Sequence, residues 1–185
     1  VRQRRKVVYR NVPENALYMG FHMGSRLDPD YYPCDVISDI LSNGYSGRLL
    51  QRLVKEKKLF SKIDAFISGS EDAGMFWIYS RVAPGVPVEV AESAVWSELD
   101  ALKQELVPQE ELEKVRNRFE SEFTFRNLSG ENLGGNVALA VMRGDADTHF
   151  REPEYYRAVT AEDLRSAAKE LFRKGNSVVL HYLKA

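Results

Sequence analysis

The residues best suited to metal chemistry are three histidines, His22, His149 and His181, which lie far apart in the sequence. A helical H-x-x-E-H motif binds zinc through two imidazoles one turn apart, and its glutamate acts on the metal-bound water. His149 and Glu152 in "HFREP" have the spacing of the first histidine and the glutamate, but Pro153 occupies the place of the second histidine. Because proline offers no ligand and disfavours a helix interior, we expect no zinc site here and assign no helix to the segment.

The other patterns of catalytic chemistry are also incomplete. Gly130 and Gly135 have the outer spacing of a phosphate-binding P-loop, yet Asn136 and Val137 stand where the loop needs lysine and Ser/Thr. No serine lies in a G-x-S-x-G pattern. We therefore expect no catalytic residue, metal ligand or cofactor site within this chain.

Residue periodicity predicts the elements of the first half. β-branched residues predict a short strand over 6–11, and apolar residues at every second position predict strands over 17–23, 63–67 and 75–82. The turn "SGSEDAG" (68–74) between the last two predicts an antiparallel hairpin. Between the strand pairs, a stripe of Cys34, Ile37 and Leu41 predicts a helix that begins at Asp30, and a second helix is predicted over 46–57.

The second half is mostly helical. Apolar residues at intervals of three and four predict helices over 88–106, 108–123 and 133–141. Thr160 and Asp163 resemble a capping box that starts a helix ending at Phe172, and "SVVLHYL" (177–183) predicts a last strand. The order β-β-α-α-β-β-α-α-α-α-β predicts one α+β domain, residues 1–185, with helices packed on one face of a largely antiparallel sheet.

Composition and charge exclude several classes of protein. The 26 basic and 27 acidic residues give a formal charge of -1, which argues against a nucleic-acid-binding protein. The basic run from Arg2 to Lys6 is expected to be a solvated lead-in to the first strand. No apolar run approaches the roughly 20 residues of a membrane span.

A lone cysteine, Cys34, allows no internal disulfide. Its apolar and aromatic neighbours predict a buried, unreactive thiol. This and the lack of a signal-peptide pattern favour a cytoplasmic location, although the compartment stays open. Because the chain starts at Val1 rather than Met, we expect it to be a piece of a longer protein.

Four segments taken together resemble the C-terminal half of pitrilysin/insulinase-type zinc peptidases, in particular bacterial two-domain processing-peptidase-like members. They are "ILSNGYSGRLLQRLVKEKKLFSKIDAFISG", "EDAGMFWIYSRV", "VPQEELEKVRNRFESEF" and "VTAEDLRSAAKELF" followed by a strand. The likeness runs from about Asn15 to Tyr182. It implies a clamshell of two homologous α+β halves, in which the N-terminal half carries H-x-x-E-H and zinc. The C-terminal half then binds no metal and closes over the substrate.

The residues that this family uses to contact the substrate are replaced in this chain. Members often have an arginine and, seven residues later, a tyrosine that reach the bound peptide, with a glycine between them. The matching positions are Val54 and Ser61, with Lys58 at the glycine position. Valine cannot donate a hydrogen bond, and serine is too short to replace the phenol. The resemblance thus implies substrate-binding positions at Val54 and Ser61 without the usual side chains, and Leu59 and Phe60 as candidates to line the cleft.

The resemblance implies the non-catalytic, substrate-enclosing domain of a zinc metalloendopeptidase, inactive alone, with zinc in the partner half. Its partners would be the homologous N-terminal half, covalent or separate, and an extended peptide that pairs with an exposed sheet edge; a dimer is also allowed. The alternative is a proteolytically inactive scaffold subunit of the same fold. A hydrolase that uses His149 and Glu152 is a third candidate. The isolated chain is expected to fold and to expose an apolar surface where the partner half docks.

Overall fold

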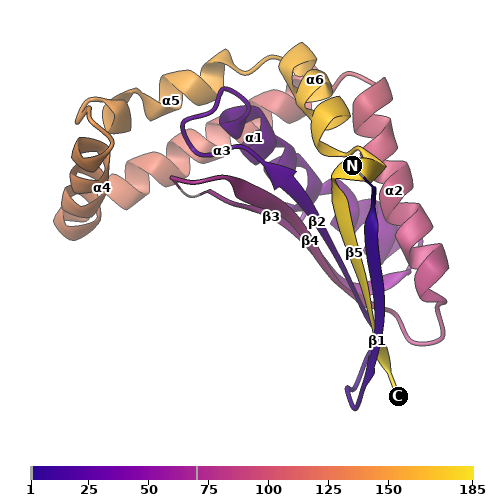
Figure 1. Ribbon diagram of the computed structural model, residues 1–185. Coiled ribbons are helices and arrows are strands. Elements are labelled where there is room, and N and C mark those ends of the chain that lie inside the picture. The colour runs from indigo at the N-terminus through magenta and orange to yellow at the C-terminus, as the bar shows by residue number, and fades with distance from the viewer. Residues whose placement is uncertain (1, 70) are drawn as a thin grey trace.

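The computed structural model describes residues 2–69 and 71–185, which form a five-stranded sheet with helices packed against it (Figure 1). The strands are β1 (Arg4–Arg10), β2 (Ala16–Met23), β3 (Phe60–Ser68), β4 (Gly74–Val82) and β5 (Ser177–Lys184). The helices are α1 (Tyr31–Ser42), α2 (Val88–Gln104), α3 (Gln109–Asn127), α4 (Gly130–Met142), α5 (Thr148–Ala158) and α6 (Ala161–Leu171), with the π-helical η1 (Leu50–Glu56) and the 3₁₀ turn η2 (Lys174–Asn176). The predicted α+β class is confirmed.

The strands lie in the order β1-β5-β2-β4-β3. β2 is antiparallel to both β4 and β5, and β3 and β4 form the predicted antiparallel hairpin. The turn predicted over 68–74 includes Ser70, which lies outside the described residues. β1 pairs in parallel with β5, so the first and last strands are neighbours and the sheet is mixed.

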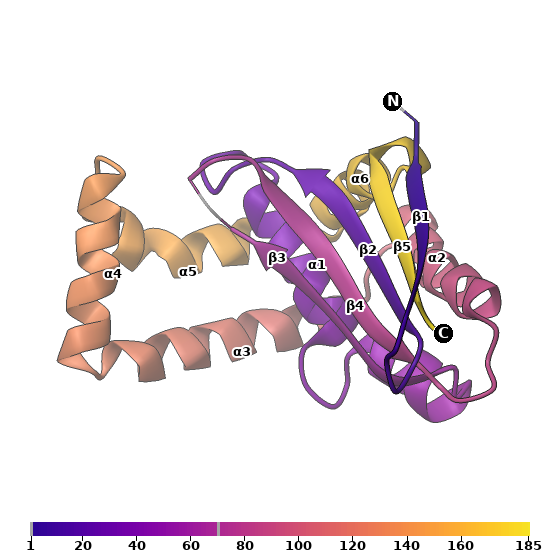
Figure 2. The ribbon, with the colours of Figure 1, turned by 60° about the horizontal axis from the view of Figure 1, so that its bottom comes forward.

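One face of the sheet packs against helices, as predicted. Leu17, Met19 and Phe21 alternate along β2 and are fully buried on this face. α1, α2 and α6 lie over it (Figure 1). In the part of the chain that the structure describes, no helix covers the opposite face, which is turned to the viewer in Figure 2. No described helix is long and apolar enough to cross a bilayer.

Edge-to-face aromatic contacts hold the core between the sheet and the helices. The ring centroids of Phe21, Phe76 and Phe172 lie 5.1–6.5 Å apart, and Trp96 lies 5.7 Å from Phe21. Cys34 is buried in the same core, and burial raises the pKa of its thiol to about 12. The prediction of a buried thiol is confirmed.

α3, α4 and α5 form an arm that extends away from the sheet, with α4 lying across the far ends of α3 and α5 (Figures 1 and 2). Ala140 is the one buried residue described in α4. Val141, in the helix predicted over 133–141, is 56% exposed because α4 packs mainly on α3 and α5 and lies away from the core of the sheet. Leu106 lies beyond the end of α2 and is 44% exposed, although the helical stripe predicted it inside.

The sequence predicts no helix over 148–158, and this prediction is wrong: the structure contains α5 with Pro153 inside it. A proline in a helix removes one backbone hydrogen bond and costs about 3 kcal/mol. The helix persists because tertiary packing stabilises it: the ring of Tyr156 stacks on Phe119 of α3 at a centroid distance of 3.6 Å, and His149 is also buried.

Candidate functional site

The predicted substrate-binding positions flank the turn that joins η1 to β3. A regular helix was expected over 46–57, whereas η1 is a short π-helix in which the Lys57 N–H donates to the carbonyl oxygen of Arg52, five residues earlier (N···O 3.0 Å). Lys58 then adopts φ +53° in the left-handed region, and the chain turns into β3. Glycine reaches this conformation without a Cβ clash, which gives a physical reason for the family's glycine at this position.

The four candidate side chains of this turn lie in different environments. Val54 and Leu59 are half-buried and pack against the core, while Phe60 is 2% exposed and is part of the core. Ser61 is exposed, and its Oγ donates to the carbonyl oxygen of Arg81 (O···O 3.4 Å). The substrate-binding role of Val54 and Ser61 and the cleft-lining role of Leu59 and Phe60 stay predictions.

Arg52 does not take the place of the missing arginine. Its Nη1 donates to Oε2 of Glu98 on α2 (N···O 2.7 Å), and the Glu98 side chain is only 6% exposed. This ion pair ties η1 to α2 on the helix-covered side of the sheet. The guanidinium is therefore occupied by a structural contact.

β3 is the last strand of the sheet and pairs only with β4 among the described strands. Its outer edge is open to an added strand, the arrangement by which sheets bind extended peptides through main-chain hydrogen bonds. A shallow groove runs beside it, between β3 and Asp39 and Ser42 of α1.

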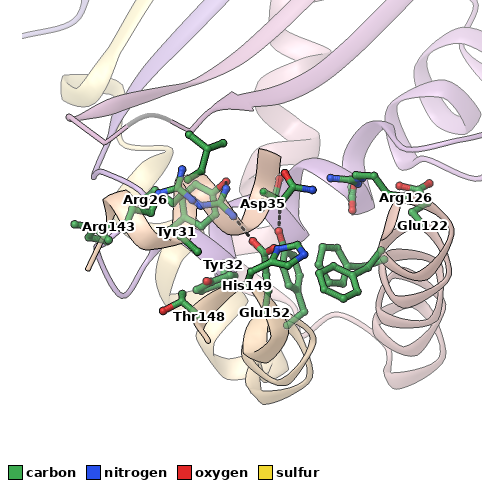
Figure 3. Close-up of a pocket in the computed structure, with 18 residues that line it drawn as sticks. Arg26, Tyr31, Tyr32, Asp35, Glu122, Arg126, Arg143, Thr148, His149 and Glu152 are labelled. Atoms are coloured by element: carbon green, nitrogen blue, oxygen red, sulfur yellow. Dashed lines mark hydrogen bonds and ion pairs between the residues drawn. The ribbon is translucent and has the colours of Figure 1, made fainter. Parts of the chain in front are cut away.

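A cavity of about 350 Å³ lies where the arm meets α1 (Figure 3). Arg26 donates from Nη1 to the Tyr31 hydroxyl (N···O 2.7 Å) and forms an ion pair with Glu152 of α5. The rings of Phe119 and Phe123 on α3 line the opposite wall. Residues 126 positions apart in the sequence meet here, and no sequence motif links them.

The α1 wall of this cavity carries two carboxylates with unusual proton affinity. The Tyr156 hydroxyl donates to Asp35, and burial raises the pKa of both groups above their ordinary values. Burial, together with the nearby charge of Asp35, raises the pKa of Asp39 to about 6.

His149 and Glu152 of "HFREP" line this cavity but do not suit zinc. Nε2 of His149 lies 3.1 Å from Oδ1 of Asn127, whereas Glu152 is paired with Arg26. In Figure 3 these side chains lie among an arginine, aromatic rings and Asp35, whose carboxylate accepts a hydrogen bond from Tyr156. No group of three His, Cys, Asp or Glu residues able to hold a metal occurs in residues 2–69 and 71–185. The donor set described here does not fit a zinc ion, so no chemical step is assigned to one in this chain.

Comparison with known proteins gives one family and several similar structures. A family model described as "Peptidase M16 inactive domain" matches residues 1–119. The chain is 22% identical to the zinc protease PqqE of Helicobacter pylori over 162 residues, which cover 88% of this chain and 36% of that protein. The chain thus spans about a third of the length of this curated relative.

Two solved structures share the fold over nearly all of this chain. A protease from Helicobacter pylori has a TM-score of 0.90 at 21% identity. The match covers 96% of this chain and 43% of the protease chain. The inactive peptidase domain of a zinc protease candidate from Bordetella parapertussis has a TM-score of 0.83 at 24% identity, with 96% and 95% covered. With a family model that matches well over half of its residues, this chain belongs to the pitrilysin-like peptidase M16 family, as an inactive domain.

Proposed function

We propose that this chain is the non-catalytic, substrate-enclosing C-terminal domain of a zinc metalloendopeptidase whose H-x-x-E-H motif and zinc lie in a homologous partner half. The observation that carries the proposal is the coexistence of the M16 inactive-domain fold with a donor set that does not fit zinc. The length of the relatives supports it. The matching region makes up 36% of the zinc protease PqqE and 43% of the Helicobacter pylori protease of known structure.

In this proposal the chain contributes surfaces rather than reacting groups. The η1–β3 turn is left-handed at Lys58, a conformation that a glycine would also adopt, although Val54 and Ser61 cannot supply the usual hydrogen bonds to the peptide. The open edge of β3 offers main-chain donors and acceptors to an extended substrate. The chain therefore holds and encloses the substrate while the partner half cleaves it.

The first experiment is on the native protein: its intact mass, its sequence upstream of this chain and its zinc content. We expect a product about twice this size with one zinc and an upstream H-x-x-E-H. The two halves are then produced separately and assayed on an unstructured peptide. Addition of this chain is expected to raise kcat/KM of the zinc-containing half at least tenfold, and no increase would contradict the proposal.

The alternative is a proteolytically inactive scaffold subunit. The replacement of the family's arginine and tyrosine by Val54 and Ser61 favours it, because a scaffold has no need to contact a substrate. A partner half without H-x-x-E-H and without zinc would establish the scaffold. Restoration of the pair by Val54→Arg with Ser61→Tyr is expected to raise kcat/KM only if the partner half is a protease.

A further inference from the structure

The face of the sheet that no described helix covers is turned to the viewer in Figure 2 and is here named the open face. Several aromatic residues lie on it. Because alternate residues of a strand point to opposite faces, the strand register places Tyr18, Trp77, Tyr79, Tyr182 and Phe66 on it. The ring of Tyr18 lies 5.2 Å from that of Tyr79 and 6.4 Å from that of Tyr182, measured between centroids. Four of the rings are half-buried and Phe66 is 49% exposed.

Trp77 of β4 lies beside Gly20 of β2, which has no side chain. A Cβ on Gly20 would stand 3.1 Å from the Trp77 ring and 2.7 Å from Cε of Met75, so these side chains pack directly on the backbone of β2. The result is a low aromatic surface at the centre of the sheet rather than a row of projecting side chains.

The same register gives this face a strong excess of positive charge. Six cations of the strands lie on it: Arg4, Lys6, Arg10, Lys62, Arg81 and Lys184. The one carboxylate among the described strand residues of this face is Asp64, whose Oδ2 lies 3.0 Å from Nζ of Lys62. The chain as a whole carries a charge of -1, so the charges are segregated by face and not by composition.

We propose that the open face binds extended peptide segments that carry acidic and aromatic side chains. The inference rests on the proposed function, in which the chain encloses a peptide substrate, and it names the class of substrate. The tyrosines and Trp77 offer ring faces and edges to aromatic side chains, and the surrounding cations attract carboxylates and repel basic peptides. Neither the residues of the η1–β3 turn nor the edge of β3 is needed for this selectivity.

The test measures binding of labelled, unstructured 12-residue peptides to the 185-residue chain by fluorescence anisotropy. An isolated domain is a reasonable form to use, since this chain covers 95% of the Bordetella domain whose structure was solved. One peptide combines Glu and Phe, a second replaces Glu with Lys, and a third replaces Phe with Ala. The Glu/Phe peptide is expected to bind at least tenfold more tightly than either of the others, and more weakly as salt rises.

Two charge-reversed variants of equal net charge locate the binding. Arg81→Glu with Lys184→Glu, on the open face, is expected to weaken binding of the Glu/Phe peptide at least tenfold. Lys169→Glu with Arg173→Glu lies in and just after α6, on the helix-covered side, and is expected to change binding less than twofold. Trp77→Leu is expected to weaken binding severalfold without a change of charge.

Three results would overturn the proposal. In the first, the Lys/Phe peptide binds as tightly as the Glu/Phe peptide. In the second, the two charge-reversed variants weaken binding of the Glu/Phe peptide equally. In the third, a dT12 oligonucleotide binds as tightly as the Glu/Phe peptide and is weakened to the same extent by Arg81→Glu with Lys184→Glu. The last result would make the face a general surface for polyanions. If the native protein proves to be a zinc peptidase and peptide selectivity is absent, this inference fails alone. A partner half without zinc would instead refute the proposed function.

Discussion

Lys58 occupies a backbone position that favours glycine. At φ +53° the left-handed conformation costs a non-glycine residue roughly 1–2 kcal/mol, part of which glycine loses again through its greater freedom in the unfolded chain. Lys58→Gly is therefore expected to raise the free energy of unfolding by roughly 0.5–1 kcal/mol, measured by urea denaturation. Lys57→Gly is the matched control, since Lys57 has φ -82° and gains no relief. It is expected to destabilise, and a gain equal to that of Lys58→Gly would refute the explanation.

Asp39 couples stability to pH near neutrality. Burial is the main cause of its pKa of about 6, with Asp35 and Glu122 raising it further and Asn43 and Arg118 lowering it. Because the folded-state pKa exceeds the unfolded value, the stabilisation is complete below pH 3.8 and is lost as pH rises through about 6. The ionised carboxylate is thus a cost at neutral pH.

Asp39→Asn is expected to raise the free energy of unfolding at pH 7.5 by on the order of 1 kcal/mol, and to change it little at pH 4. Asp163→Asn is expected to lower the free energy of unfolding at pH 7.5, because hydrogen bonds from the hydroxyl and backbone N–H of Thr160 stabilise the Asp163 carboxylate and lower its pKa. Its contribution is present above the unfolded pKa and is lost as pH falls through the folded one. Urea denaturation of both variants across pH 2.5–8 gives the comparison, and parallel curves would contradict it.

At the scale of elements, β1 depends on one buried carboxylate. Glu92 of α2 accepts hydrogen bonds from Arg5 of β1, at Nη1 (N···O 2.7 Å) and Nη2 (2.5 Å), and from Nε1 of Trp96 (N···O 3.1 Å). Nε2 of His181 on β5 lies 2.6 Å from Glu92 Oε2. Burial raises the pKa of Glu92, but the hydrogen bonds, first that from Arg5, bring it below its ordinary value. β1 is otherwise almost wholly exposed, so this network fixes it to the helix layer.

Glu92→Ala is expected to lower the free energy of unfolding by about 2 kcal/mol, because it leaves the buried His181 and Trp96 without their acceptor, whereas Arg5 is 44% exposed and can turn to water. Hydrogen exchange should then become faster along β1 before the other strands. Glu89→Ala, on the exposed face of the same helix, is expected to change stability by less than about 0.5 kcal/mol. Unchanged protection of β1 in Glu92→Ala would show that pairing with β5 alone holds the strand.

At the scale of the whole molecule, the arm exposes large apolar side chains to water. Their exposure does not stabilise an isolated domain. Phe125, Leu128 and Met142 are 71%, 75% and 82% exposed. Exposed apolar surface of this kind is typical of a docking site, and the proposed function supplies a partner half. The isolated chain is therefore expected to bind a hydrophobic dye and to self-associate.

Leu128→Ser with Met142→Ser is expected to reduce dye fluorescence at least twofold without loss of secondary structure. Val90→Ser on α2, at a residue that is 50% exposed, is the control and is expected to leave it unchanged. Dye binding by fluorescence and molecular mass by light scattering give the readouts. A monodisperse monomer that binds no dye would contradict the docking surface.

The sequence by itself determined the elements whose periodicity matches their burial. The alternation of Leu17, Met19 and Phe21 predicted β2, and intervals of three and four predicted α2 and α6, because local pattern decides which face of an element can be buried. The interruption of H-x-x-E-H by Pro153 was equally visible, since a motif of fixed spacing is either complete or not.

Only the tertiary structure decided the features that depend on contacts between distant residues. Parallel pairing of β1 with β5, the helix around Pro153 and the meeting of Arg26 with Glu152 all join segments far apart in the chain. The same holds for the segregation of charge on the open face, which depends on the register of five strands. Local propensity cannot encode these, because their free energies come from packing and electrostatics that exist only after the chain has folded.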